Sequence, residues 1–273
     1  MSNKLTLVAI VTTLGLALSG EALAGPLEDA AAAGRRGDYA TAIQLLRPLA
    51  TEGNAEAQYN LGIGYESGKG VPQDYAEALK WFRLAADQGF AAAQNTLGAM
   101  HGSGKGLPKD YTEAVKWYRL AAEQGYPIAQ HNLAFMHDNG IGVPQNDAEA
   151  MKWYRLAAEQ GYADAQNNLA RLYLLGEGVP QDYVEASKWF RMAADQGEAL
   201  SQNILGTMYF DGKGVPQDYV EAYIWLSLAA ARYPASEREN RDKSVKSRDA
   251  SAAKMTPAQI AEAQKRIRDW KPK

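Results

Sequence analysis

The chain repeats itself every 36 residues. Tryptophan recurs at this spacing, and glycine, proline and an Ala-Ala pair recur in the same register. The five tryptophans are Trp81, Trp117, Trp153, Trp189 and Trp225. A fixed period of this length indicates stacked supersecondary units, because one unit cannot bury its apolar face alone. The sequence therefore predicts five tandem units over 54–233, at 54–89, 90–125, 126–161, 162–197 and 198–233.

Each unit is predicted to be a pair of helices. In the first unit Ala57, Leu61 and Tyr65 have the spacing of one helical face, and Gly68 and Gly70 then end that helix. The second helix is expected to begin at a capping box, in which an Asp or Asn caps a first-turn N–H and a Glu three residues later reaches back. The pairs are Asp74 with Glu77, Asp110 with Glu113, Asn146 with Glu149, Asp182 with Glu185 and Asp218 with Glu221. No run in the repeats alternates with period two, so the fold class is all-α.

Both ends of the array depart from the pattern, as terminal repeats do when they cap a stack. Residues 38–53 follow the second half of the unit, so 25–53 is expected to be a divergent N-terminal repeat or cap. Pro234 interrupts the period, a polar stretch follows, and Thr256 begins another helix signal. We expect 234–273 to be a C-terminal helical cap or tail, docked through Ile260, Ile267 and Trp270.

Two sets of recurring residues are expected to serve packing. A small residue recurs where helices must approach closely, at Gly62, Gly98, Ala134, Ala170 and Gly206, so a bulky side chain there should break the stack. The tryptophans at helical spacing are expected to lie in the core and not to form a ligand platform.

The motif AQYNLGIGYESGKGVPQDYAEALKWFRLAADQG, with its inserted Gly-x-Gly-Val-Pro loop, resembles the Sel1-like repeat family, a relative of the tetratricopeptide repeats. The resemblance covers about two thirds of the chain, or 180 of 273 residues. It implies a right-handed α-solenoid of helix-turn-helix repeats that serves as a scaffold or adaptor, frequently in the bacterial envelope or in secreted proteins. Exported cysteine-rich members, to which a β-lactamase activity has been attributed, join their helix pairs by disulfides. This chain has no cysteine.

Composition excludes several classes of protein. Hydrophobic residues make up 46% and charged residues 22%, which is enough to bury a core. The net charge of −3 argues against a nucleic-acid binder. The absence of cysteine excludes disulfides, thiol catalysis and Cys-ligated zinc. From Arg232 to Lys273 the net charge is 12 − 6 = +6; a solvated cap helix is favoured there over a site for an anionic partner.

The first 24 residues have the pattern of a secretory signal peptide. Lys4 precedes an apolar stretch from Leu5 to Leu18, and Ala22-Leu23-Ala24 offers small residues for cleavage after Ala24. The stretch is shorter than the ~20 residues that a spanning helix needs. We therefore expect a periplasmic or secreted protein with no transmembrane anchor after cleavage, and a monomer.

No catalytic, cofactor-binding or metal-binding residue is predicted. The Gly-x-Gly loops are followed by an Asp or Asn cap, which in four of five units places negative charge where a phosphate would sit. His101 and His137 fill the slot that Tyr65 has in the first unit, and two imidazoles with only Asp138 nearby make a poor metal shell. His131 lies on a different helical face.

First-helix positions that differ between matched units are expected to be free of packing and available for recognition. They are Tyr59, Ile63 and Glu66; Asn95, Ala99 and Gly102; His131, Phe135 and Asp138; Asn167, Arg171 and Leu174; and Asn203, Thr207 and Phe210. These positions are predicted to line a concave groove that binds a protein or peptide partner. The alternative is an ordinary polar face that binds nothing.

We favour a non-enzymatic adaptor of the envelope that binds its partner in this groove. Three other hypotheses stay open at this point. One is a periplasmic regulator that restrains an envelope signalling receptor, and another is a secreted factor that acts on host proteins. The third is an enzyme acting on cell-wall or β-lactam substrates, which the absence of a nucleophile paired with a base disfavours.

Overall fold

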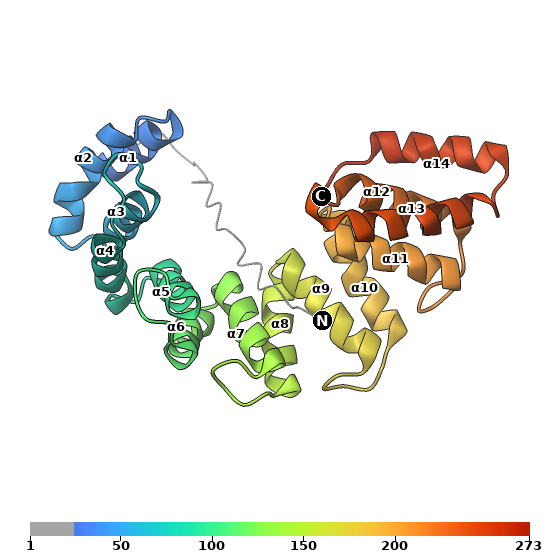
Figure 1. Cartoon of the computed structure of the whole chain (residues 1–273), viewed down its shortest axis with the longest axis horizontal. Coiled ribbons are helices and arrows are strands. Elements are labelled where there is room, and N and C mark those ends of the chain that lie inside the picture. The colour runs from blue at the N-terminus through green and yellow to red at the C-terminus, as the bar shows by residue number, and fades with distance from the viewer. Residues whose placement is uncertain (1–24) are drawn as a thin grey trace. The chain divides into compact units, whose positions relative to one another are not determined.

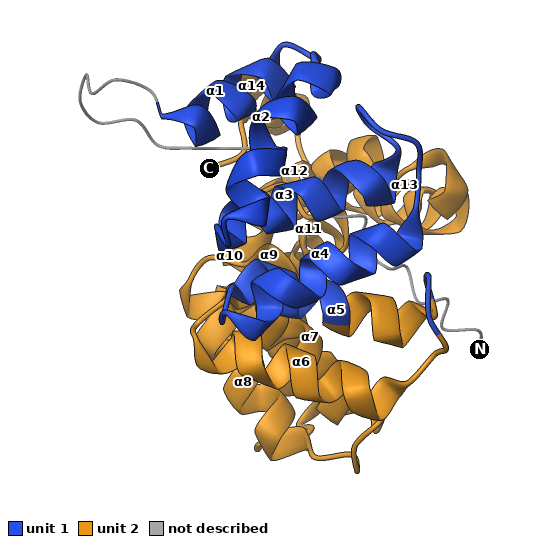
Figure 2. Cartoon of the chain, turned by 90° about the vertical axis from the view of Figure 1, so that its left-hand side faces the viewer, with its two compact units in different colours: residues 1–97, 105–107 blue, residues 98–104, 108–273 orange. Residues whose placement is uncertain are grey.

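The computed structural model describes residues 25–273, and the predicted signal peptide at 1–24 lies outside them. The described residues form fourteen α-helices and one short 3-10 helix, with no strand among them (Figure 1). This confirms the all-α fold class. The chain divides into two compact units (Figure 2). Unit 1 contains 25–97 and Lys105–Leu107, and unit 2 contains Gly98–Gly104 and Pro108–Lys273.

Unit 1 consists of two helix pairs and the first half of a fifth helix. Its helices are α1 (Pro26–Arg35), α2 (Tyr39–Thr51), α3 (Ala55–Ser67), α4 (Tyr75–Asp87) and the start of α5 (Ala91–Ser103). Within it α1 packs on α2, α2 on α3, and α3 on α4. Ile43, Leu46, Ala57 and Leu61 form its buried core, and Trp81 packs against them half-buried.

Unit 2 continues the same alternation. Its helices are the end of α5, α6 (Tyr111–Glu123), α7 (Pro127–Asn139), α8 (Asp147–Glu159), α9 (Ala163–Leu175), α10 (Tyr183–Asp195), α11 (Ala199–Asp211), α12 (Tyr219–Arg232), α13 (Arg238–Ala252) and α14 (Pro257–Asp269). From α6 to α13 each helix packs on the next, as in an α-solenoid. Trp153 and Trp225 are buried, which confirms that these tryptophans serve packing.

The caps at the repeat helices explain where each helix starts and stops. Asp74 accepts hydrogen bonds from the N–H groups of Ala76 and Glu77, and Asp110, Asn146, Asp182 and Asp218 cap α6, α8, α10 and α12 in the same way. The first helix of a repeat ends at a glycine in the left-handed conformation, for example Gly212 with φ +68°.

The predicted capping boxes are wrong in their second half. The glutamates do not reach back to the caps: Glu77 pairs with Lys80 one turn later, and Glu149 accepts from the indole N–H of Trp153. A Lys three residues ahead and a Trp four residues ahead compete for the carboxylate along the helix surface. Among the described helices, the reciprocal box forms at Thr256 and Gln259, where α14 begins.

The second glycine of the inserted loop contacts the preceding repeat. Gly214 has φ +70°, and a Cβ at that position would lie closer than 3.0 Å to the backbone of Tyr183, the first residue of α10. Gly142 contacts Tyr111, at the start of α6, in the same way. Gly161 also has a positive φ, but it makes no such contact, because nothing would lie within 4 Å of a Cβ at that position. The Gly-x-Gly loop therefore holds one repeat against the next.

The C-terminal region differs in part from the expectation. The polar stretch after Pro234, to which no helix was assigned, forms α13, and it packs along α12. Helix α14 also packs on α12, and Ala263, Ile267 and Trp270 join the apolar cluster around Trp225. Tertiary packing, and not the polar sequence of α13, decides that this helix forms.

Candidate functional site

The candidate groove lies on one face of the first helices of the repeats, which we call the A-helix face. It consists of the i, i+4 and i+7 positions of α3, α5, α7, α9 and α11. In unit 1 this face contains Tyr59, Ile63 and Glu66. In unit 2 it contains Ala99, Gly102, His131, Phe135, Asp138, Asn167, Arg171, Leu174, Asn203, Thr207 and Phe210. Asn95 belongs to the part of α5 that falls in unit 1.

In unit 1 the face is largely used for packing. Tyr59 is 8% exposed, and its ring centroid lies 5.7 Å from that of Phe82 and 5.3 Å from that of Phe90. Asn95 is 1% exposed. Neither side chain is available to a partner, so the expectation that these two positions are free of packing is wrong.

An ion pair in unit 1 links the loop after α5 to α3, the first helix of the preceding repeat. Lys105 Nζ lies 2.9 Å from Glu66 Oε1 and 5.0 Å from the ring centroid of Tyr75. Partial burial acts to lower the pKa of Lys105, but the hydrogen bond and charge of Glu66 outweigh it and raise that pKa. Glu66 is thus held in place, and Ile63 remains half-buried beside it.

In unit 2 the third repeat contributes a half-buried imidazole. The His131 ring lies 5.5 Å from Tyr154 and 5.2 Å from Tyr162, measured between centroids, and Nε2 lies 3.0 Å from Nδ2 of Asn168 in the next first helix. Burial lowers the pKa of His131, while the nearby Asp164 charge opposes the shift. His131 is neutral near pH 7 and links α7 to α9.

A charged cluster occupies the middle of the face in unit 2. Arg171 on α9 pairs with Asp138 on α7 at 2.5 Å and also with Glu177. The Tyr154 hydroxyl donates to the same Asp138 at 3.4 Å. Partial burial acts to lower the pKa of Arg171, but the two carboxylates raise it overall. The guanidinium is therefore fixed in one orientation, with its side chain 33% exposed.

In the last two repeats the face positions also bond to residues of a following helix. Asn167 donates to Ser201 at 2.6 Å and to Glu198 at 3.2 Å, both on or at the start of the next first helix. Asn203 donates to Ser244 of α13. Leu174 packs against the apolar cluster around Trp225.

The positions that vary between units are therefore pairing positions, which corrects the assumption behind the predicted groove. Contacts with a residue about one repeat further along are made by Glu66, His131, Asp138, Asn167 and Asn203. On this face Thr207 is exposed, while Ile63 in unit 1 and Phe135, Arg171 and Phe210 in unit 2 are among the half-buried side chains. Their binding role stays a prediction.

The tyrosine slot has a partner that the sequence analysis missed. Arg155 on α8 donates to the hydroxyl of Tyr173 on α9, and Arg191 on α10 donates to Tyr209 on α11. An arginine two residues after the tryptophan in four of the five repeats is the sequence signal for this pairing. His137 takes this slot beside Arg119; burial first, and then the Arg119 charge, lower its pKa. His137 is 7% exposed, which supports its predicted packing role.

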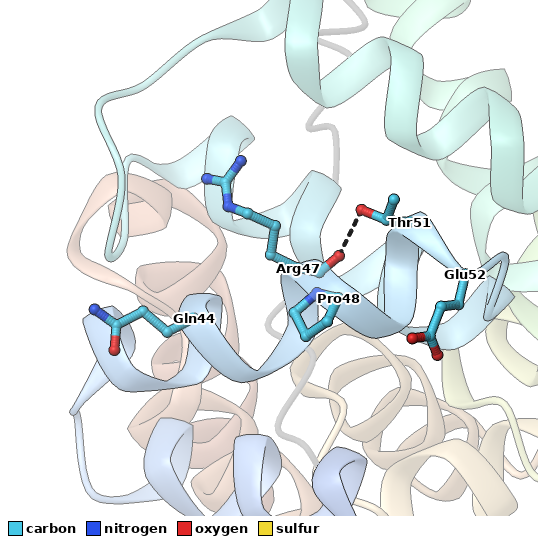
Figure 3. A pocket seen from close by; sticks show the side chains of 5 residues that line it. All are labelled: Gln44, Arg47, Pro48, Thr51 and Glu52. Atoms are coloured by element: carbon cyan, nitrogen blue, oxygen red, sulfur yellow. Dashed lines mark hydrogen bonds between the residues drawn. The ribbon is translucent and has the colours of Figure 1, made fainter.

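The surface depressions do not gather catalytic groups. An open depression of about 500 Å³ is lined by Gln44, Arg47, Pro48, Thr51 and Glu52, and Figure 3 shows these side chains along the single helix α2. A smaller cavity of about 70 Å³ lies between α11 and α13, lined by Thr207, Phe210, Ser247 and Ala250. Neither contains a nucleophile beside a base.

The described part of the chain has neither a candidate metal cluster nor a candidate membrane span. Within residues 25–273, no cluster of three or more His, Asp or Glu side chains is placed to hold a metal ion. Over the same range, no helix has the length and apolar composition that a membrane span requires.

Comparison with protein families matches a model described as Sel1 repeat five times, at residues 55–90, 91–126, 127–162, 163–198 and 199–233. The chain belongs to the Sel1 repeat family. Proteins built from Sel1 repeats are generally scaffolds for protein–protein interaction and not enzymes. A comparison with curated proteins finds no match.

Two solved structures resemble this Sel1 repeat chain. A Sel1 repeat protein from Oxalobacter formigenes is 33% identical, with 78% of this chain and 88% of that chain covered and a TM-score of 0.72. A protective antigen of uropathogenic Escherichia coli strains that displays an SLR fold is 29% identical, with 90% of this chain covered and a TM-score of 0.57. This chain spans 60% of that antigen's length.

Proposed function

We propose that this Sel1 repeat protein is a non-enzymatic adaptor of the bacterial envelope, periplasmic or secreted, that binds a protein or peptide on the A-helix face of unit 2. The observation that carries the proposal is the fixed cluster around Arg171. Its guanidinium is held by two acids from α7 and from the loop after α9, yet one third of the side chain stays exposed. Preorganised side chains of this kind lose little entropy on binding.

The accessible residues of the face combine two kinds of contact. Phe135 and Phe210 offer apolar area, while Arg171 and Thr207 offer hydrogen-bond donors. A partner that alternates apolar side chains with neutral hydrogen-bond acceptors would satisfy both, because Asp138 and Glu177 already neutralise the charge of Arg171. The partner is a protein or peptide and not a nucleic acid, in keeping with the net charge of −3.

Site-specific photocrosslinking tests the location of this surface. A photoreactive phenylalanine analogue is placed at Phe135 or Thr207, and as a control at Lys116 of α6, whose side chain is 66% exposed. Envelope extract is then irradiated with each full-length protein. We expect one protein to crosslink from both face positions and not from Lys116. Crosslinking from Lys116 alone would place the partner elsewhere.

The envelope location has a separate test. The mature protein should begin at Gly25, which intact mass determination after cell fractionation would reveal. Recovery of the uncleaved chain from the cytoplasmic fraction would contradict the proposed envelope location. It would not affect the proposed binding surface, which the crosslinking experiment tests separately.

A further inference from the structure

The chain's own C-terminal segment occupies a surface that recurs, unoccupied, in earlier repeats. After α14 the backbone becomes extended at Trp270, with φ −67° and ψ 133°. The segment 270–273 then runs to the C-terminal end of α10 in the fourth repeat. We call this surface, at the end of each repeat's second helix, the edge site.

Three contacts hold the segment in the fourth repeat. The backbone N–H of Lys273 donates to the carbonyl oxygen of Asp195 at 2.9 Å, and its ammonium lies 2.8 Å from the same residue's carboxylate. The Trp270 ring lies 4.2 Å from the Arg232 guanidinium. Gly197 lies beside the segment, since a Cβ there would be in ordinary van der Waals contact, at 3.7 Å, with both Trp270 and Pro272.

Two earlier edge sites in unit 2 have the same elements without an occupant. Glu159 and Gly161 stand 36 residues before Asp195 and Gly197, and Glu123 and Gly125 stand 36 residues earlier again. A Cβ at Gly125 or Gly161 would meet nothing within 4 Å. Within residues 25–273 neither glutamate forms an ion pair, and both are exposed.

Apolar surface adjoins both of these sites. Leu120 is 45% exposed and Leu156 is 38% exposed, each three residues before the glutamate on the same helix face. The equivalent residue of the fourth repeat, where the segment 270–273 lies, is Met192, which is 48% exposed. The same exposed apolar neighbour therefore lies beside the edge site that an aromatic and basic segment of the chain contacts.

We propose that the edge sites at Glu123–Gly125 and Glu159–Gly161 bind a partner protein through an extended segment in which an aromatic residue precedes a lysine by three positions, as Trp270 precedes Lys273. The aromatic ring packs over the glycine, the ammonium pairs with the glutamate, and the backbone N–H donates to the glutamate's carbonyl. In place of Arg232 these sites have Gln160 and Gln196, so binding relies on packing and on the ion pair. This surface is separate from the A-helix face, and the proposal stands apart from the function proposed above.

The test uses the full chain and a labelled peptide with the sequence of residues 266–273, RIRDWKPK, with binding followed by fluorescence anisotropy at low salt. A second peptide carries W270A and keeps every charge. We expect saturable binding of the first peptide and at least tenfold weaker binding of the second, since electrostatic attraction alone would not distinguish them.

Two protein variants locate the binding. The double variant Glu123→Lys and Glu159→Lys should weaken the peptide at least tenfold. Asp211→Lys with Asp242→Lys makes the same change in net charge at exposed acids away from the edge sites, and should leave binding within twofold. Equal weakening by both pairs would show a general charge effect and overturn the proposal.

A third variant distinguishes peptide binding at the edge sites of the second and third repeats from displacement of the segment 270–273 in the fourth repeat. If Asp195→Lys abolishes binding while the Glu123→Lys and Glu159→Lys variant retains it, the peptide is replacing the chain's own C-terminus in the fourth repeat, and the proposal is wrong. Absence of binding to the native chain at millimolar peptide would also refute it. None of these outcomes depends on whether the A-helix face crosslinks to a partner.

Discussion

The contact between Gly214 and Tyr183 allows a direct test of what the inserted loop does. Gly214→Ala adds a Cβ that would collide with the carbonyl of the first residue of α10, and backbone atoms cannot move aside as a flexible side chain can. An alanine with positive φ costs about 1–2 kcal/mol in backbone strain. Overpacking against a fixed neighbour costs about 1–3 kcal/mol more. We therefore expect Gly214→Ala to lower the free energy of unfolding by about 2–5 kcal/mol.

Gly161→Ala is the matched control. Gly161 has φ +88°, so an alanine there meets the same kind of strain, but nothing lies within 4 Å of its Cβ. This variant should cost only the strain, about 1–2 kcal/mol. The difference between the two variants measures the repeat-to-repeat contact of the loop.

Urea unfolding followed by circular dichroism gives the two free energies, and hydrogen exchange with mass spectrometry locates the loss. Because a solenoid is stabilised by contacts between neighbouring repeats, protection should fall mainly in α10–α12 of the Gly214→Ala protein. If Gly161→Ala costs as much as Gly214→Ala, the loop glycines serve backbone conformation alone and the stacking argument fails.

Three further predictions concern packing and titration in unit 2. Arg171→Met should lower the free energy of unfolding by about 1–2 kcal/mol, because it leaves the half-buried Asp138 without its ion-pair partner, and adding Asp138→Asn should recover part of that loss. A double-mutant cycle measured by urea unfolding tests this, and additive effects of the two substitutions would contradict the coupling. Gly98→Ala should destabilise by about 1–3 kcal/mol, since its Cβ would lie 2.7 Å from the Tyr118 ring, whereas Gly102→Ala, with only a methyl at 3.8 Å, should raise the thermal midpoint through a helix propensity gain of about 0.5–1 kcal/mol. The pKa of His137 is lowered in the folded state, so the unfolded chain binds more protons below pH ~6.5 and stability is lost as pH falls through that range. Replacing it with tyrosine, as in the fourth and fifth repeats, should flatten the decline by up to about 1.4 kcal/mol per pH unit, and an unchanged pH profile would contradict this.

Much of the local structure could be predicted from the sequence because it depends on residues close in the chain. The Asp and Asn caps, the terminal glycines and the apolar face of each second helix follow from spacing within 36 residues. The glutamates of the predicted capping boxes could not be assigned in this way. The Glu149 carboxylate instead accepts from the indole N–H of Trp153 on the next turn, a contact that the capping pattern alone does not predict.

The candidate site shows the opposite case. The sequence predicts that positions differing between repeats are free of packing, yet Asp138 and Arg171 are paired with each other across two repeats. Contacts of this kind join residues 33 or more positions apart, and their geometry is set by how one helix pair lies on the next. No local pattern contains that information.

The sequence by itself determined the repeat, the helix pair and the family, since these follow from periodicity, caps and turn glycines. Tertiary structure decided which polar side chains are consumed by neighbouring repeats, that the polar segment Arg238–Ala252 is helical, and that the segment from Trp270 to Lys273 returns to α10. The physical reason is that a short, highly charged segment has no preference strong enough to fix its own fold, and takes its structure from the surface on which it packs.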